Sequence, residues 1–391
     1  MKQTLLVSLM LLTLASPASA EGNGGVIGLV RRLGTFIDSM SVRGVDRRYI
    51  DAPEKPWQII LRGNVNQTDL KMKSMMDVTG ILPGISGNLN WEPRIKTVPA
   101  TYVGLWAGYR GYGLGYSVNV SGDEGSYLTF GAMGGSFGIN FRLHRFETDD
   151  ASIHFFGNVE GHEFNETETG KLDDPIRVRT LFIDGYYLFN GRYCSYAAAY
   201  DQSVIQKRSA GSVIAGAMYY YTHLDFSQPR NADFMEVMNG IGNIRQWQAG
   251  IGAGYIYNFV PCRGLLVSAQ LMPILAFFDR VKVTRYESNN DDYEDEYLDI
   301  DSRYEHGRIT EEQHDRLLSA LADNYQVWEV GEETANGKVK LNFDARLSVT
   351  YQWDRFFINA YGQFCNFPYS YDDGSGRLND WYINASIGLR L

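Results

Sequence analysis

The chain has 391 residues, and its 36 Lys and Arg against 46 Asp and Glu give a net charge of −10. This acidic balance argues against a nucleic-acid partner, which requires basic surface. The chain is rich in glycine (41), tyrosine (26) and phenylalanine (20), and a disordered chain would lack these aromatic residues. Its mean hydropathy of −0.27 fits a wall that has one apolar and one polar face.

The first twenty residues are predicted to be an export signal. Lys2 supplies positive charge, residues 5–14 form an apolar core, and Ala18-Ser19-Ala20 fits the small-residue cleavage rule. The mature chain is therefore expected to begin near Glu21. No later segment contains the roughly 20 apolar residues that a membrane helix needs. A location in a membrane would then require a closed barrel, because lipid offers no partner to unpaired backbone groups.

Residues 21–56 are predicted to form an N-terminal helix and linker. Within 24–48, apolar residues recur at spacings of three to four, as in a short amphipathic helix. Packing on one end of the barrel is the favoured interpretation of this helix, and a membrane-surface or plug role is the alternative. Pro53 and Pro56 mark the linker.

From Trp57 onward the pattern favours β-strands, which begin with 57–65 and continue rapidly from Thr101. Further strands are predicted near 127–146, 152–161, 177–189, 193–207 and 211–226, then over 246–259 and from 265 into the 280s. Residues 66–100 divide into a short strand and a long loop. The total is about 12 strands (10–14), and a single-chain bacterial barrel has an even number. The up-and-down order is not consistent through 161–211, where one segment is misassigned.

An insertion near 284–337 interrupts the strands. Its first part is an acidic run, for which calcium binding is one interpretation and a solvated loop the favoured one, because the run lacks the central glycine of an EF-hand. The acidic residues are Asp291, Asp292, Glu294, Asp295, Glu296, Asp299 and Asp301. Its second part, 310–325, is predicted to be helical, with Thr310 and Gln313 at capping-box spacing. Counting strands back from a periplasmic C-terminus places the insertion outside the cell.

The strongest pattern is at the C-terminal end. Over 338–353 apolar and polar residues alternate, so that Leu341, Phe343 and Leu347 lie on one face and Asn342, Asp344 and Arg346 on the other. The alternation restarts after Trp353-Asp354 and again from Trp381, so that Ile358 and Phe364 are expected to face lipid and Asn359 and Gln363 the lumen. Two-faced strands with terminal aromatics predict a transmembrane antiparallel up-and-down β-barrel in the cell outer membrane, over residues 57–391.

Short motifs along the chain resemble those of a known family. They are Val42-Arg43-Gly44-Val45-Asp46 with Tyr49-Ile50 and Pro56-Trp57, Gly108-Tyr109-Arg110-Gly111 with Leu114-Gly115-Tyr116, and 206–212, Gln-Lys-Arg-Ser-Ala-Gly-Ser. Together they resemble a domain-of-unknown-function family of outer-membrane barrels in Bacteroidetes-type bacteria, over roughly residues 40–391. The resemblance implies location and architecture, and it implies no activity or catalytic residue.

Glu147-Thr148-Asp149-Asp150 is predicted to be a hairpin turn. Such a turn would place His144 opposite His154 and Asn140 opposite Asn158. The resulting candidate lumen cluster consists of Asn140, Arg142, His144, His154, Asn158 and Glu160. A narrow barrel must fill its interior with paired polar groups, and this is the favoured interpretation of the cluster. The alternative uses a histidine beside a carboxylate as a general base.

Other chemical motifs are weak. Gly131, Gly134, Gly135 and Gly138 are flanked by strands on both sides, which favours small residues in a curved wall over a phosphate loop. Aromatic residues such as Trp353 and Trp381 are predicted to form interface girdles, with sugar binding as the alternative. The three cysteines have no metal-ligand spacing, although an oxidising compartment would allow one bridge. No cofactor and no metal site is predicted.

The sequence therefore favours a non-enzymatic, porin-like or structural outer-membrane barrel. Its expected partners are outer-membrane lipids and lipopolysaccharide, together with small solutes if the lumen is open. An outer-membrane enzyme acting on lipid or lipopolysaccharide is one alternative. A soluble periplasmic β-sandwich is another, and it would need a second sheet to cover the outward aromatic faces.

Overall fold

The computed structural model describes residues 44–77, 87–96, 99–122, 124–159, 162–238, 240–288, 290–324, 326–337, 339–371 and 374–391. The predicted export signal, the predicted N-terminal helix as far as residue 43, and Glu160 lie outside the described residues. Within the described part of the chain no helix is long and apolar enough to cross a membrane.

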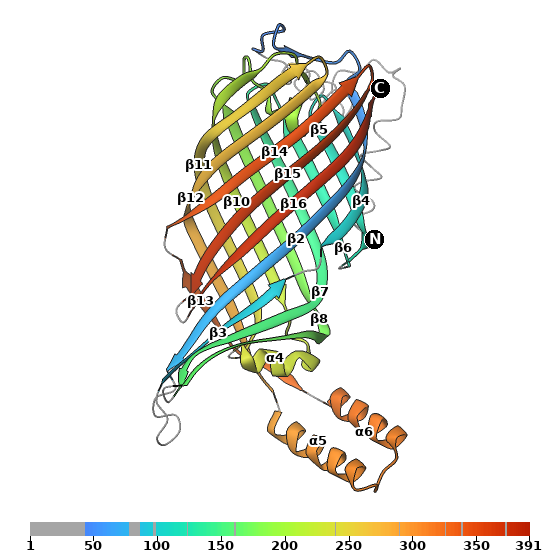
Figure 1. Cartoon of the computed structure of the whole chain (residues 1–391), viewed down its shortest axis with the longest axis vertical. Coiled ribbons are helices and arrows are strands. Elements are labelled where there is room, and N and C mark those ends of the chain that lie inside the picture. The colour runs from blue at the N-terminus through green and yellow to red at the C-terminus, as the bar shows by residue number, and fades with distance from the viewer. Residues whose placement is uncertain are drawn as a thin grey trace, which may run out of the picture. The chain divides into compact units, whose positions relative to one another are not determined.

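Twelve strands form a closed antiparallel ring (Figure 1). Each strand pairs with the ring strand that follows it in the chain, and the last strand pairs with the first along Arg390↔Gln58 to Gly374↔Ser74. The ring strands are β2 (Trp57–Asp77), β4 (Ala100–Tyr109), β5 (Tyr112–Ser121), β6 (Gly125–Met133), β7 (Phe137–Val159), β8 (His162–Leu188), β10 (Ala210–Asp225), β11 (Ile241–Cys262), β12 (Leu265–Ser288), β14 (Lys340–Trp353), β15 (Phe356–Tyr371) and β16 (Gly374–Arg390). The predicted strand number and up-and-down order agree with this ring.

Two further strands extend the sheet beyond the ring. β3 (Gly87–Lys96) pairs with the far ends of β2 and β7, and β13 (Val327–Asn336) pairs with the far end of β12. A separate two-residue pair joins β1 (Ile50–Asp51) to β9 (Ile205–Gln206). The helices are α3 (Tyr196–Tyr200), η1 (Pro229–Asn231), α4 (Ala232–Val237), α5 (Asn290–Glu305) and α6 (Glu311–Asn324).

The two ends of the ring differ in the length of their connections. At the end that holds the C-terminus, residues 110–111, 134–136, 263–264 and 354–355 join neighbouring strands, and the one long connection at this end is 189–209, between β8 and β10. Arg110 and Gly111 both have positive φ, at 51° and 89°, as a two-residue type I′ hairpin turn requires. We call this end the short-turn end. At the opposite end lie the longer connections with α4, α5, α6 and β13.

Burial in the ring is inverted relative to a water-soluble core. On β14, Asn342, Asp344 and Ser348 are each 1% exposed, whereas Leu341 and Leu347 are 52% and 57% exposed. Because successive side chains of a strand point to opposite faces, the polar residues line the interior and the apolar residues form the outer surface. β15 repeats the pattern, with Ile358 and Phe364 exposed and Asn359 and Gln363 buried. The predicted division of these side chains into two faces is confirmed.

Two glycines make room for one large interior side chain. Trp106 is buried with Ile60 and Phe357. A Cβ atom on Gly108 or on Gly113 would lie 2.0 Å from the Trp106 ring. Since real side chains do not approach so closely, only glycine lets the indole lie flat against the wall.

Several sequence predictions are wrong in their boundaries. Residues 127–146 are not one strand: β6 and β7 meet at the turn 134–136. The predicted turn at 147–150 lies instead within the continuous strand β7, where the register with β8 shifts from Thr148↔Ile176 to Asp150↔Lys171. Its acidic residues mimic a turn, but β8 supplies cross-strand cations, with Lys171 Nζ 2.8 Å from Asp149 Oδ2. Residues 193–207 are predicted as a strand, yet they lie inside the ring, and this misassignment explains the inconsistent strand order.

The insertion near 284–337 differs from its prediction in its first half and agrees with it in its second half. The acidic run is helical, as α5, rather than a loop. The second half is α6, and it begins with the predicted capping box: Thr310 N–H donates to Gln313 Oε1 at 3.0 Å, and Gln313 N–H donates to Thr310 Oγ1 at 3.3 Å. Among the described residues no cluster of His, Cys, Asp or Glu fits a metal ion. Cys194, Cys262 and Cys365 are all free thiols.

Candidate functional site

A short internal segment enters the ring from its short-turn end. Residues 190–206, which we call the plug, connect β8 to β10 and include α3 and β9. Ser195 caps α3, because its hydroxyl accepts a hydrogen bond from Ala198 N–H at 3.2 Å. Three consecutive alanines follow, and alanine has the highest helix propensity. All five α3 residues are buried, so a polar ring here encloses a small apolar helix.

The plug touches strands all around the ring. Its backbone carbonyls accept hydrogen bonds from wall side chains on β2, β11, β14, β15 and β16, and Tyr196 stacks on Tyr186 of β8 with ring centroids 3.8 Å apart. The donors and acceptors are Gln58 to Gln202 (2.7 Å), Asn258 to Ser195 (2.7 Å), Ser348 and Asn359 to Ala199 (2.7 and 3.2 Å), and Arg390 to Gln202 (2.9 Å). These contacts satisfy the polar backbone of a segment withdrawn from water.

Burial changes the acid–base properties of two plug residues. Burial raises the pKa of the Cys194 thiol to about 12, so this thiol is a poor nucleophile. Burial also raises the pKa of the Asp201 carboxyl, against the lowering effect of Ser203, Arg62 and Arg390.

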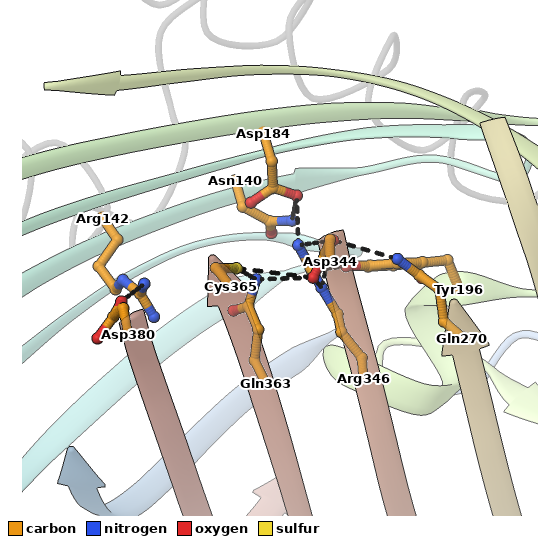
Figure 2. Close-up of polar contacts among 10 residues, drawn as sticks. All are labelled: Asn140, Arg142, Asp184, Tyr196, Gln270, Asp344, Arg346, Gln363, Cys365 and Asp380. Carbon is orange, nitrogen blue, oxygen red and sulfur yellow. Dashed lines mark hydrogen bonds and ion pairs between the residues drawn. The ribbon is translucent and has the colours of Figure 1, made fainter. Parts of the chain in front are cut away.

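A charged cluster joins opposite sides of the ring (Figure 2). Arg346 of β14 donates from Nε to both carboxylate oxygens of Asp344 at 3.0 Å, and its Nη2 lies 3.2 Å from Asp184 Oδ2 on β8. β14 and β8 are separated by three ring strands, so this contact crosses the interior. The same guanidinium donates to the Tyr196 hydroxyl of the plug. Arg346 thus ties two walls and the plug together.

Neutral amides complete the charged cluster. Asn140 donates to Asp184 at 2.9 Å, while Gln363 and Gln270 donate to Asp344 at 3.1 and 3.3 Å. Asp344 and Arg346 are 1% and 7% exposed. A buried carboxylate needs this many donors, because its lone pairs are otherwise left without water.

A second cross-ring ion pair lies among aromatic rings. Arg142 Nη2 of β7 is 2.9 Å from Asp380 Oδ2 of β16. The Arg142 guanidinium also lies 5.4 Å from the Phe182 ring centre and 5.1 Å from that of Tyr382. Aromatic faces attract cations, so these rings reinforce the pair. Tyr220 of β10 stacks on Phe367 of β15 at 4.1 Å, again across the interior.

The structure separates the members of the predicted lumen cluster. Asn140, Arg142 and His144 point inward as expected. His144, 4% exposed, stacks on Tyr127 at 3.8 Å and shares a 3.0 Å hydrogen bond with the Tyr102 hydroxyl. Its Cα partners are Tyr127 and Thr180, not His154. Its hydrogen-bonding neighbour is thus a phenol and not a carboxylate.

The remaining members lie elsewhere, because β7 continues where a turn was predicted. His154 is ten residues beyond His144 on the same strand, or about 33 Å at the usual rise per residue. It shares a 2.7 Å hydrogen bond with Asn165 and lies between Glu92 and Thr167 in the sheet. Asn158 is exposed farther along β7, and Glu160 lies outside the described residues. The predicted pairing of the two histidines is wrong.

Sequence reasoning missed Asp184 and Asp380 as members of the interior clusters. Both had a usable signal. Asp184 is the one charged residue of the stretch 181–188, between Ile183 and Gly185, and Asp380 directly precedes Trp381, which begins an alternating run. An inward-facing acid in the middle of a strand demands a cation across the ring, yet a single sequence does not say which one.

Replacing His144 by alanine tests whether this residue is structural. We expect the free energy of unfolding to fall by about 2 kcal/mol, since the change leaves a cavity beside Tyr127. His144→Phe keeps the stacked ring and should be much milder. Melting temperature and lipid-ester hydrolysis are measured together. Wild-type hydrolysis that disappears in a variant of unchanged melting temperature would instead make His144 a catalytic candidate.

Comparisons with known proteins add a family and several solved structures. The domain of unknown function DUF4421 matches residues 45–388. No curated protein matches the chain. Similar solved structures include a bacterial polysaccharide outer-membrane secretin (8% identity, 87% of this chain and 99% of that chain, TM-score 0.29) and the COG4313 outer-membrane channel of Pseudomonas putida F1 (9%, 87% and 97%, 0.27). OmpT, an outer-membrane protein of Vibrio cholerae, is also similar (9%, 86% and 99%, 0.25).

Proposed function

Since this chain belongs to the DUF4421 family, a domain of unknown function, and its strands β14 and β15 bury polar side chains and expose apolar ones, we propose that it is a non-enzymatic outer-membrane β-barrel with a closed lumen. In this proposal the protein is a structural wall component rather than an open pore. Its immediate partners are membrane lipids, including lipopolysaccharide.

The inverted burial of β14 carries the proposal. Exposed leucines beside fully buried Asn, Asp and Ser would be unfavourable in water, because apolar surface is stabilised by removal from water. A hydrocarbon surrounding reverses that preference for the outer face. A soluble β-sandwich would cover these apolar faces with a second sheet, whereas here a single sheet closes on itself.

The height of the apolar wall supports a membrane. On β11 all outward residues from Trp247 to Phe259 are aromatic or aliphatic: Trp247, Ala249, Ile251, Ala253, Tyr255, Tyr257 and Phe259. The strand length from Trp247 to Phe259, at about 3.3 Å per residue and a typical barrel tilt, spans roughly 30 Å of membrane normal. This matches a hydrocarbon core of about 30 Å.

The difference between the two ends supports an orientation. Bacterial barrels have short periplasmic turns and longer extracellular loops. The short-turn end would then face the periplasm, with the plug beside it. The α5–α6 insertion would lie outside the cell.

The contents of the ring favour a closed wall over a solute pore. The plug, the Arg346 cluster and the Arg142–Asp380 pair each bring together side chains from opposite strands. Two histidines of the predicted cluster hydrogen-bond to neutral groups, His144 to the Tyr102 hydroxyl and His154 to the Asn165 amide, and among the described residues neither forms a hydrogen bond with a carboxylate.

Planar-bilayer recording tests the closed lumen. Purified full-length protein that has inserted should give no steady conductance. Insertion is verified separately, by faster migration of unboiled samples on gels and by resistance to carbonate extraction from outer membranes. A steady ohmic conductance from inserted wild-type protein would show that the lumen is an open pore and that the closed-lumen proposal is wrong. Recovery as a soluble periplasmic monomer would overturn the location itself.

A further inference from the structure

Five basic side chains lie side by side on the outer surface of the ring, one on each of five consecutive strands. Arg145 of β7 pairs with Arg179 of β8, and Arg179 pairs with His223 of β10. His223 then pairs with Arg245 of β11, and Arg245 with Lys282 of β12. The residues before and after each of them are buried or half-buried, so all five point outward. We call Arg145, Arg179, His223, Arg245 and Lys282 the basic row.

The chain itself neutralises only part of the basic row. Lys282 Nζ lies 2.5 Å from Glu332 Oε2 on β13. Within the described part of the chain, Arg145, Arg179 and Arg245 make no ion pair or hydrogen bond through their side chains. Like charges directly opposite each other destabilise a sheet. Arg145 and Arg179 are directly opposite each other, and Arg245 lies on the other side of His223. Three guanidinium groups without an ion pair therefore share one row on a chain of net charge −10, and they call for an external anion.

Nearby acids do not fill this need. Glu147 lies two residues after Arg145 on β7, and Asp225 lies two residues after His223 on β10, so both are next to the basic row. Glu147 Oε1 is 3.7 Å from Arg177, and Asp225 Oδ1 accepts hydrogen bonds from the Ser227 hydroxyl and N–H. Both acids thus have partners of their own.

An aromatic depression adjoins the basic row on the side of the apolar wall. It is lined by Leu181, Tyr219, Tyr221, His223, Arg245 and Trp247. Tyr221 and Trp247 are directly paired, with ring centroids 5.5 Å apart. The site is therefore amphipathic, with cations at one edge and an apolar floor that continues toward the middle of the wall.

We propose that the basic row and the aromatic depression bind a phosphate-bearing lipid of the surrounding leaflet. The phosphate would lie on Arg179 and Arg245, with Arg145 beside them, and an acyl chain would lie over Tyr221 and Trp247. Guanidinium groups bind phosphate oxygens through paired, charge-assisted hydrogen bonds. Trp247 ends the apolar wall at this side, and the next outward residue on its strand, Arg245, stands at headgroup level.

The lipid site rests on the proposed outer-membrane barrel, and in the proposed orientation it faces the outer leaflet. Its test uses the folded full-length protein in micelles of uncharged detergent, where no particular membrane location is assumed. Failure of the protein to insert into bilayers would refute the barrel proposal, whereas a failed titration in micelles would refute the lipid site alone.

The titration compares two lipids that differ only in phosphate, dioleoyl phosphatidic acid and dioleoylglycerol, by native mass spectrometry. We expect phosphatidic acid to bind at least tenfold more tightly than dioleoylglycerol. The variant R145Q/R179Q/R245Q should lose at least tenfold of that affinity, while R179K/R245K should lose less. Inorganic phosphate at the same concentration should not displace the lipid.

The matched control is R47Q/R263Q/R355Q, which removes three exposed arginines that lie away from the basic row. It should bind phosphatidic acid like wild type. Without lipid, R145Q/R179Q/R245Q should melt at the same temperature as wild type or higher, because like-charge repulsion is relieved. Equal lipid affinity in the two triple variants would refute the site. Displacement by inorganic phosphate would make it a soluble-anion site, contrary to the proposal.

Discussion

Replacing Arg346 by alanine should lower the free energy of unfolding by about 3–5 kcal/mol, the usual loss when one partner of a buried ion pair is removed. Arg346 is the cation between Asp344 and Asp184, at 2.8 and 3.2 Å, and it also holds the plug through Tyr196. Without Arg346, the buried carboxylates of Asp344 and Asp184 would lose the cation that lies between them. Denaturant unfolding of the protein refolded in micelles measures the change.

Two further variants show whether charge or packing is responsible. Arg355→Ala removes an exposed arginine at the β14–β15 turn and should change stability by less than about 0.5 kcal/mol. R346M/D344N/D184N removes the charges together and should recover most of the loss, since replacing a whole buried ionic group is often neutral. If R346A were as stable as R355A, the charged cluster would not hold the ring together.

Leu347→Arg should destabilise the protein by about 2–4 kcal/mol in lipid vesicles. Leu347 lies midway between the outward residues Leu341 and Trp353 and is 57% exposed. In the proposed orientation it faces the middle of the bilayer, where a guanidinium is most unfavourable. Urea-dependent folding into vesicles of defined lipid composition gives the free-energy difference from wild type.

Val339→Arg is the matched control, because Val339 is similarly exposed (61%) and precedes the same strand at the end of the ring opposite the short-turn end. Near the headgroups, arginine should change stability by only about 0–1 kcal/mol. A soluble protein would tolerate both substitutions alike. Equal and small effects at the two positions would therefore refute the lipid-facing wall.

The local pattern of the strands predicted most of the wall. Alternation on 338–353 fixed which side chains face in, because a one-residue error would reverse every position. Single-strand patterns do not, however, distinguish a hairpin from a longer strand. The acidic run 147–150 has turn composition, but its fate depends on Lys171 and Arg177 of β8, which are distant in sequence.

The plug and the cross-ring pairs were beyond sequence reasoning for a related reason. Tyr196-Ala-Ala-Ala-Tyr200 is apolar enough for a strand, and only the enclosing ring decides that it becomes a helix inside. Likewise Arg346 and Asp344 were placed on the inner face, yet their partner Asp184 lies 160 residues away or more. No periodic pattern in the sequence indicates which residues will be in contact across a closed ring.

The pairing of β16 with β2 sets an order of assembly for the newly made chain. The first ring strand keeps one edge open until the last strand has been synthesised, and such distant pairings form slowly. The plug precedes β14, β15 and β16 in the chain and contacts all three, so it can serve as a template around which they assemble. Because Arg390 donates to the Gln202 carbonyl, a chain that lacks Arg390 loses this link between the closing strand and its template.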